Sequence, residues 1–226
     1  MTVEIRRGAT RFADRGAGMA TWHSFSFGAH YDAANVGFGP MVCHDEHLLG
    51  LGRGFETHSH AGLEIVTWLL SGALTHTDST GHTARVSPGT VGLLSAGSGV
   101  EHSEIADAPQ TRFVQVWLTS DEPERAPAYE TREVDVVRGS FVEVARPTSS
   151  ATFSVARLEP SQSVTLPAAP KQHLFVGTGA LLRSSLAEPL DQGDAFLIED
   201  EPSVTVTAAV PTELLLWSFT NPRLGD

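Results

Sequence analysis

The chain has 226 residues, of which 41% are hydrophobic and 19% are charged, so it can bury a core and does not belong to the disordered class. Its formal net charge of -12 comes from 27 acidic and 15 basic residues, and the basic residues form no run. Without a basic patch, counterion release contributes little to binding, which argues against direct contact with nucleic acid.

Neither the N-terminal segment nor the apolar runs carry a signal for export or membrane insertion. The first residues, MTVEIRRGATRF, lack the apolar core of a signal peptide. The longest apolar runs, Ile65 to Leu70 and Leu214 to Trp217, are too short to span a bilayer. The single cysteine, Cys43, excludes an intramolecular disulfide and an all-thiolate metal site, and is expected to be a small buried residue. A cytoplasmic protein is therefore expected.

Short runs rich in Val, Thr, Leu, Phe and Trp, broken by Gly, Pro, Asp or Ser, predict β-strands throughout the chain. No amphipathic helix of more than a few turns is found. The first half contains these predicted strands: Leu63 to Leu70, Ala73 to Thr77, Thr83 to Val86, Val91 to Leu94 and Phe113 to Leu118.

A polar, proline-containing segment at residues 120–129 predicts a linker or a crossover. The strand pattern then restarts. The two halves have similar lengths and textures, so an all-β fold of two tandem β-barrels is expected, with residues 1–131 as the first and 132–226 as the second. The second half contains these predicted strands: Ser140 to Val144, Phe153 to Leu158, Ser163 to Leu166, His173 to Val176, Ala195 to Ile198, Ser203 to Thr207 and Thr212 to Phe219.

Nine of the ten histidines precede residue 103, and two short segments among them predict a metal site. His58 and His60 are two residues apart, so in an extended strand both point to the same face. His102 and Glu104 have the same spacing, behind Gly97 and Gly99, which allow the backbone to bend. If the two strands face each other across a barrel interior, three imidazoles and one carboxylate surround one ion. This donor set suits divalent first-row metals.

Neighbouring polar residues are assigned simpler roles. His76 and His82 lie near a predicted hairpin and are expected to face solvent, with a position lining the pocket as the less favoured alternative. The polar cluster at residues 44–47 is expected to be a solvated turn. Glu64 is either a ligand or a partner that orients a histidine. We favour the second role, because a metal that already binds Glu104 gains little from another buried anion.

Several of these segments resemble a known family. Residues 52–72 resemble the first cupin motif, G-x5-H-x-H-x3-E followed by a glycine, and residues 99–102 resemble the core of the second. More specifically, the chain resembles the pirin family of bicupins, strongly through residues 1 to about 130 and weakly beyond. The segments that carry this resemblance are Trp22-His-Ser-Phe-Ser-Phe27, Gly54-Phe-Glu-Thr-His-Ser-His60, Gly81-His-Thr with Pro88-Gly89, and Ser95-Ala-Gly-Ser-Gly-Val-Glu-His-Ser-Glu104.

The resemblance implies two cupin-type barrels and assigns the ligands. In pirins the metal is held by the two H-x-H histidines and by the H-x-E histidine with its glutamate. These positions are His58, His60, His102 and Glu104 here, and Glu64 is not among them. One divalent ion is expected, iron(II) first, with manganese, nickel, cobalt, copper or zinc as alternatives. No organic cofactor is implied.

The resemblance also implies an activity. Bacterial pirins are associated with quercetin 2,3-dioxygenase activity, which predicts a flavonol-like substrate and O₂. Glu104 is then both a metal ligand and the general base that takes the hydroxyl proton. One alternative is a non-enzymatic metal-binding regulator or redox sensor that acts through a protein partner, and another is that flavonol cleavage is incidental to a different substrate. In the second barrel, residues 171–173 offer the single imidazole of His173, and no metal is expected there.

Overall fold

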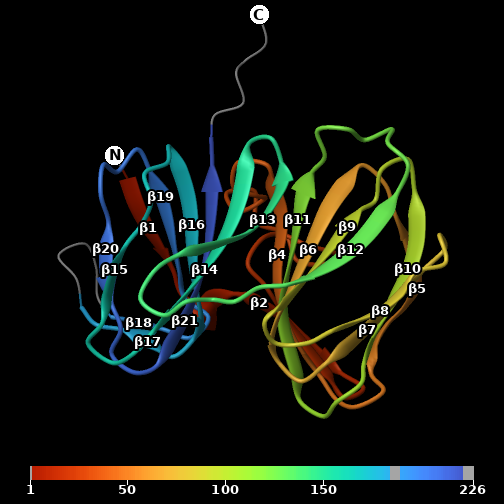
Figure 1. Cartoon of the computed structure of the whole chain (residues 1–226), viewed down its shortest axis with the longest axis horizontal. Coiled ribbons are helices and arrows are strands. Elements are labelled where there is room, and N and C mark those ends of the chain that lie inside the picture. The colour runs from red at the N-terminus through yellow and green to blue at the C-terminus, as the bar shows by residue number, and fades with distance from the viewer. Residues whose placement is uncertain (1, 184–188, 221–226) are drawn as a thin grey trace, which may run out of the picture. The chain divides into compact units, whose positions relative to one another are not determined.

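The computed structural model describes residues 2–183 and 189–220. These residues form strands throughout, apart from turns, loops and one short 3-10 helix, Gly8–Thr10, which confirms the all-β expectation. The chain divides into two compact units (Figure 1): a first unit of residues 11–134, and a second unit of residues 1–10 and 135–226. In the described part of the chain, no helix has the length and apolarity needed to cross a membrane.

The first unit consists of two antiparallel sheets. One has the strand order β12-β9-β6-β11-β4-β3-β2 and the other has the order β5-β10-β7-β8. Apolar side chains such as Leu69, Leu74 and Phe113 are fully buried in one cluster, and Ile65 and Leu94 belong to another. The strands are β2 Phe12–Gly16, β3 Met19–His23, β4 Met41–Leu49, β5 Gly54–His60, β6 Leu63–Ser71, β7 Leu74–Asp78, β8 Thr83–Val86, β9 Thr90–Ser95, β10 Val100–Ala106, β11 Thr111–Thr119 and β12 Ala128–Glu133.

The second unit has one large sheet and two short strand pairs. The large sheet has the order β1-β19-β16-β21-β14-β13, and β15 pairs with β20 and β17 with β18. Its core is an apolar cluster that includes Leu174, Phe196 and Leu216. The strands are β1 Thr2–Arg6, β13 Val142–Thr148, β14 Ala151–Leu158, β15 Ser163–Thr165, β16 Lys171–Thr178, β17 Ala180–Leu181, β18 Leu190–Asp191, β19 Ala195–Glu199, β20 Thr205–Thr207 and β21 Thr212–Phe219.

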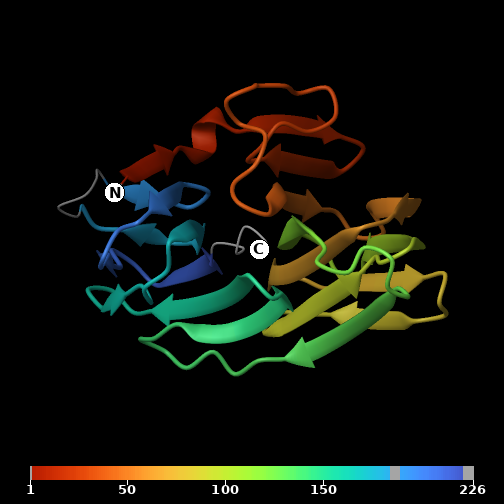
Figure 2. The same ribbon diagram turned by 90° about the horizontal axis from the view of Figure 1, so that it is seen from above.

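The first strand of the chain folds with the second unit. Figure 2 shows the red strand β1 beside the blue strands of that unit, and β1 pairs with β19 from Thr2 opposite Glu199 onward. The following turn is tied to Asp194, which accepts hydrogen bonds of 2.7 Å from both the Arg7 side chain and the Gly8 amide. The expected division at residues 1–131 and 132–226 assigns this segment to the first barrel instead. The first unit ends at residue 134, after β12 has paired with β9.

The polar cluster at residues 44–47 corrects another expectation. It is not a solvated turn but the middle of β4, and its four side chains are 0 to 5% exposed. Burial is tolerated because both carboxylates of the cluster have hydrogen-bond partners. Asp45 bonds to His23 at 2.8 Å, and Glu46 accepts a hydrogen bond from Arg112 at 2.6 Å. Cys43, on the same strand, is buried and free, which confirms its expected role.

Candidate metal centre

The predicted ligands lie on β5 and β10, which are hydrogen-bonded antiparallel neighbours rather than strands facing each other across an interior. His102 is directly opposite His58, and Val100 is opposite His60. Opposed side chains of neighbouring strands have Cβ atoms about 4.5–5.5 Å apart. The register of this strand pair, together with the two-residue spacing on β5, therefore brings three imidazoles to one place.

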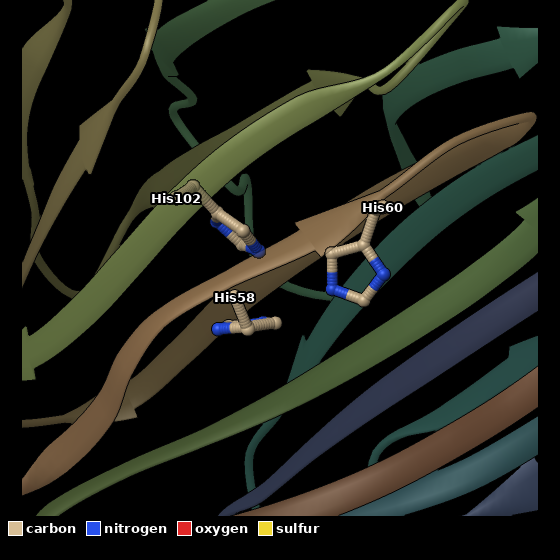
Figure 3. A group of neighbouring side chains, drawn as sticks. All are labelled: His58, His60 and His102. Atoms are coloured by element: carbon tan, nitrogen blue, oxygen red, sulfur yellow. The ribbon is translucent and has the colours of Figure 1, made fainter.

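The three rings converge, as Figure 3 shows. Ring centroids are 4.5 Å apart for His58 and His102, 4.8 Å for His58 and His60, and 5.1 Å for His60 and His102. One nitrogen from each ring lies within 4.8 Å of the others. The structure thus places the three predicted histidines in one group, with His102 buried and the other two half-buried.

The nitrogens available to an ion can be identified from the hydrogen bonds. The Nδ1–H of His58 donates to the carbonyl oxygen of Glu56 at 2.7 Å, which leaves its Nε2 lone pair available. The Nε2 atoms of His60 and His102 are buried and have no hydrogen-bond partner among the described residues. A buried polar atom without a partner is costly, and a metal ion about 2.0–2.2 Å away would satisfy both. The donor set therefore fits a divalent first-row ion.

Burial keeps the imidazoles of His60 and His102 neutral. Burial, together with the nearby His58, lowers the pKa of His60 to about 4 and that of His102 to about 3. Their lone pairs are consequently free of protons at neutral pH, as metal ligation requires.

Glu104 lies beside His102 but outside the group of three. A Glu104 oxygen, His102 and His76 form a second group of donor atoms within 4.8 Å. The Glu104 carboxylate is 3% exposed and accepts hydrogen bonds from Gln115 Nε2 at 2.7 Å and Thr67 Oγ1 at 3.4 Å. Burial raises the pKa of Glu104, and the bond from Gln115 offsets this only in part.

Local backbone features allow this arrangement. Between His102 and Glu104 the partner on β5 shifts from His58 to Phe55, so β5 carries an extra residue, a β-bulge. The two strands approach so closely here that a Cβ on Gly54 would overlap the carbonyl oxygen of Glu104. On the other side of the ligands, the glycines at residues 97 and 99 have φ values of +48° and +137°, as the sharp entry into β10 requires.

His76 was expected to face solvent, and that expectation is wrong. Its side chain on β7 is 1% exposed and stacks on Tyr129, with ring centroids 3.6 Å apart and planes 7° apart. His76 Nε2 bonds to Asp78 Oδ2 at 3.1 Å, and His76 Nδ1 lies 3.4 Å from His102 Nδ1. The signal in the sequence was the alternation of Leu74, His76 and Asp78, which all point inward from β7.

This chain of contacts determines the proton positions at His102. Burial lowers the pKa of His76. At Asp78, burial alone would raise the pKa, but hydrogen bonds from Thr80 and His76 outweigh it and lower the pKa. An ionised Asp78 accepts Nε2–H of His76, so His76 Nδ1 accepts Nδ1–H of His102. Nε2 of His102 then carries the lone pair that faces the group of three. Partners of this kind fix the tautomer of a ligating histidine.

The remaining polar candidates lie elsewhere. Glu64 accepts hydrogen bonds from Ser95 at 3.1 Å and Ser120 at 2.5 Å and does not orient a histidine in the described structure. His82 is exposed, as expected. His173, in the second unit, is 1% exposed on β16 and lies opposite Trp217.

Comparison with known proteins adds family evidence to this geometry. The family model described as Pirin matches residues 5–118. A Mycobacterium tuberculosis protein, provisionally named quercetin 2,3-dioxygenase, is 38% identical over 240 residues. The match covers 100% of this chain and 98% of that protein. Quercetin 2,3-dioxygenase of Escherichia coli O157:H7 is 30% identical over 211 residues, covering 88% of this chain and 90% of that protein. The structure of bacterial pirin YhhW of E. coli, solved with nickel(II), matches with a TM-score of 0.86 and 24% identity, and the match covers 97% of this chain and 99% of that one. The likeness confirms a fold of two cupin-type β-barrels.

Proposed function

Because this chain belongs to the pirin family, we propose that it is a cytoplasmic, metal-dependent dioxygenase that cleaves flavonols such as quercetin. The observation that carries the proposal is the pair of buried Nε2 atoms on His60 and His102 that lack a partner among the described residues, beside the ring of His58. The names of the relatives, which refer to quercetin 2,3-dioxygenase, support the choice of substrate. The further substrate is O₂.

The proposed ligands are His58, His60, His102 and Glu104. The ion that they hold would supply a Lewis acid and an O₂-reactive centre. We propose iron(II) as the resident metal. Three imidazoles and a carboxylate also suit manganese, cobalt, nickel, copper and zinc, and the E. coli pirin was solved with nickel(II). A test of activity therefore has to compare these metals.

The role proposed for Glu104 is that of general base toward the flavonol hydroxyl. A base is most effective when its pKa approaches the working pH, and burial moves the pKa of Glu104 in that direction. The bond from Gln115 Nε2 holds one carboxylate oxygen at 2.7 Å, and the other, which accepts only the longer 3.4 Å bond from Thr67, is the candidate proton acceptor. Half-buried His58 and His60 leave their side of the group open to a ligand.

The experiment is incubation of metal-quantified protein with quercetin, first without and then with oxygen, while flavonol loss and carbon monoxide release are followed. The expected result is oxygen-dependent loss with release of carbon monoxide, reduced by about 10²–10⁴-fold in Glu104→Gln and retained in the matched surface variant His82→Gln. Similar, slow turnover of several flavonols would point to another native substrate. Stoichiometric metal binding without turnover for any of the six metals would overturn the enzymatic proposal and favour a regulatory role through a protein partner.

A further inference from the structure

The first unit contains a second group of metal-ligating side chains, separate from the histidines of β5 and β10. It consists of Asp14 on β2, His23 at the end of β3 and His30 in the loop that follows. One donor atom from each lies within 4.8 Å of the others. His30 Nε2 lies 2.8 Å from Asp14 Oδ1, and His23 Nε2 lies 3.2 Å from Asp14 Oδ2. We propose that Asp14, His23 and His30 bind a divalent transition-metal ion of the zinc type.

The contacts that fix the His23 ring are of the kind that fix a metal-binding histidine. Its side chain is buried and stacks on Phe27, with ring centroids 5.1 Å apart and planes 12° apart. Its Nδ1 lies 2.8 Å from Oδ2 of Asp45, itself only 4% exposed. In the structure Nε2–H donates to Asp14, and when an ion takes the place of that proton, the Nδ1–H bond to Asp45 keeps the Nε2 lone pair directed at it. Carboxylate–histidine–metal arrangements use this same second partner.

The spacing and the charge suit a small divalent ion. With metal–ligand bonds of about 2.0–2.2 Å, ligand atoms in a tetrahedral site lie roughly 3.3–3.6 Å apart. The two distances from Asp14 to the histidines, 2.8 and 3.2 Å, reach this value with small side-chain movements. Asp14 and Asp45 bring two negative charges to two imidazoles, and one divalent cation balances them. The Asp14 side chain is 67% exposed, so water can complete the coordination.

An ion at this position would anchor the loop between β3 and β4 to the β2–β3 hairpin. Within the loop, the backbone groups of His30 and Phe27 exchange hydrogen bonds of 2.9 and 3.0 Å, so the position of His30 sets that of Phe27. The Phe27 ring packs edge-on against Trp117 at 5.4 Å, and Trp117 contacts His60 at 4.6 Å. The second ion would thus stiffen the aromatic residues beside the three-histidine group.

A row of residues on one face of the seven-stranded sheet leads from the second group to Thr67, a hydrogen-bond partner of Glu104. His23 is opposite Asp45, Asp45 is opposite Gln115, and Gln115 is opposite Thr67. Opposed residues point to the same face, and neighbouring strands are about 4.8 Å apart, so His23 lies about 14 Å across the sheet from Thr67. Thr67 in turn donates to Glu104. This separation makes two independent ions feasible.

The test is a zinc titration of metal-stripped, full-length protein against a chromophoric chelator. The wild-type chain is expected to bind two zinc ions, and His102→Ala, which lacks a ligand of the first group, is expected to bind one. Asp14→Asn and His30→Gln, each made in the wild-type chain, are expected to reduce the number from two to one. The control His82→Gln, an exposed histidine outside both groups, is expected to retain two.

Asp14 is largely exposed, so its substitution is not expected to disturb the fold, and circular dichroism checks this for each variant. X-ray absorption of the zinc retained by His102→Ala should show only nitrogen and oxygen donors, with the scattering of two imidazoles. A single zinc in the wild-type chain that is lost in His102→Ala would overturn the proposal. So would two zinc ions in Asp14→Asn with unchanged affinity, because the three side chains would then be linked only by hydrogen bonds.

Discussion

Replacing His76 with phenylalanine tests the hydrogen-bond chain from Asp78 to His102. Phenylalanine keeps a ring to stack on Tyr129, where the present centroids are 3.6 Å apart, but it removes both ring nitrogens. His102 then loses the acceptor of its Nδ1 proton, and its tautomer is no longer fixed. Asp78 keeps its bonds from the Thr80 amide at 2.8 Å and the Thr80 hydroxyl at 2.6 Å, so its loop is retained.

Two magnitudes follow from this loss. Removing a hydrogen-bond partner of a metal-binding histidine lowers metal affinity about 10–100-fold, equivalent to about 1.4–2.7 kcal/mol. The buried Nδ1–H of His102, left without an acceptor, lowers the free energy of unfolding of the metal-free protein by about 1–3 kcal/mol. We therefore expect weaker metal binding and lower stability together.

The assay is competition with a chelator for the metal affinity and urea denaturation for the stability. Both are done in an Asp14→Asn background, so that only the first group contributes to the titration. His82→Phe is the matched control, because that histidine is exposed near the same hairpin and its ring bonds to Thr80 at 2.9 Å rather than to His76 or His102. An affinity in His76→Phe equal to that of the control would refute the reasoning. It would show that His102 is oriented by the backbone register alone.

Three other substitutions test separate features of the structure. Glu104→Gln keeps the shape but removes the charge and the base, so metal binding should weaken and turnover of quercetin should fall by about 10²–10⁴-fold; full turnover would contradict the proposed base. His173→Phe should leave metal content and turnover unchanged but alter acid stability. Burial lowers the pKa of His173 to about 4 from 6.5, so the unfolded state binds more protons below pH 6.5 and the wild-type chain should lose about 3 kcal/mol as the pH falls to 4. Urea denaturation at pH 7 and pH 4.5 should show that the variant lacks this loss. Gly54→Ala should reduce stability by about 1–3 kcal/mol, since its methyl group overlaps the Glu104 carbonyl, whereas Gly16→Ala, with open space around it, should not.

Much of the strand pattern and the two segments that carry the ligands could be predicted because both depend on local spacing. Strands such as β21, predicted at Thr212 to Phe219 and observed over the same residues, show an uninterrupted apolar run bounded by turns. The spacing of His58 and His60 places both on one face of β5 in any strand. What spacing could not show was that β5 and β10 are neighbours, because pairing depends on contacts some forty residues apart.

The residues that were misjudged are polar groups whose partners lie far away in sequence. The polar cluster at residues 44–47 resembles a turn in composition, and its burial depends on partners such as Arg112, 66 positions from Glu46. His76 is similar, since its contact with His102 bridges 26 positions. Glu64 was paired with a histidine by charge reasoning, whereas the structure pairs it with two serines. For His76 and residues 44–47, composition predicts exposure and long-range hydrogen bonding reverses it.

The pairing of β1 with β19 has a consequence for the order in which the chain is made. The first unit is a continuous segment and can fold as soon as it has emerged, whereas Thr2 must wait for Glu199, 197 positions later. At about 5–20 residues per second, synthesis leaves β1 unpaired for roughly 10–40 s. An unpaired strand is open to association with other chains during that time. The charges of Glu4 and Arg6, which pair with each other at 2.9 Å, make this short strand a poor template for such association until its own partner is made.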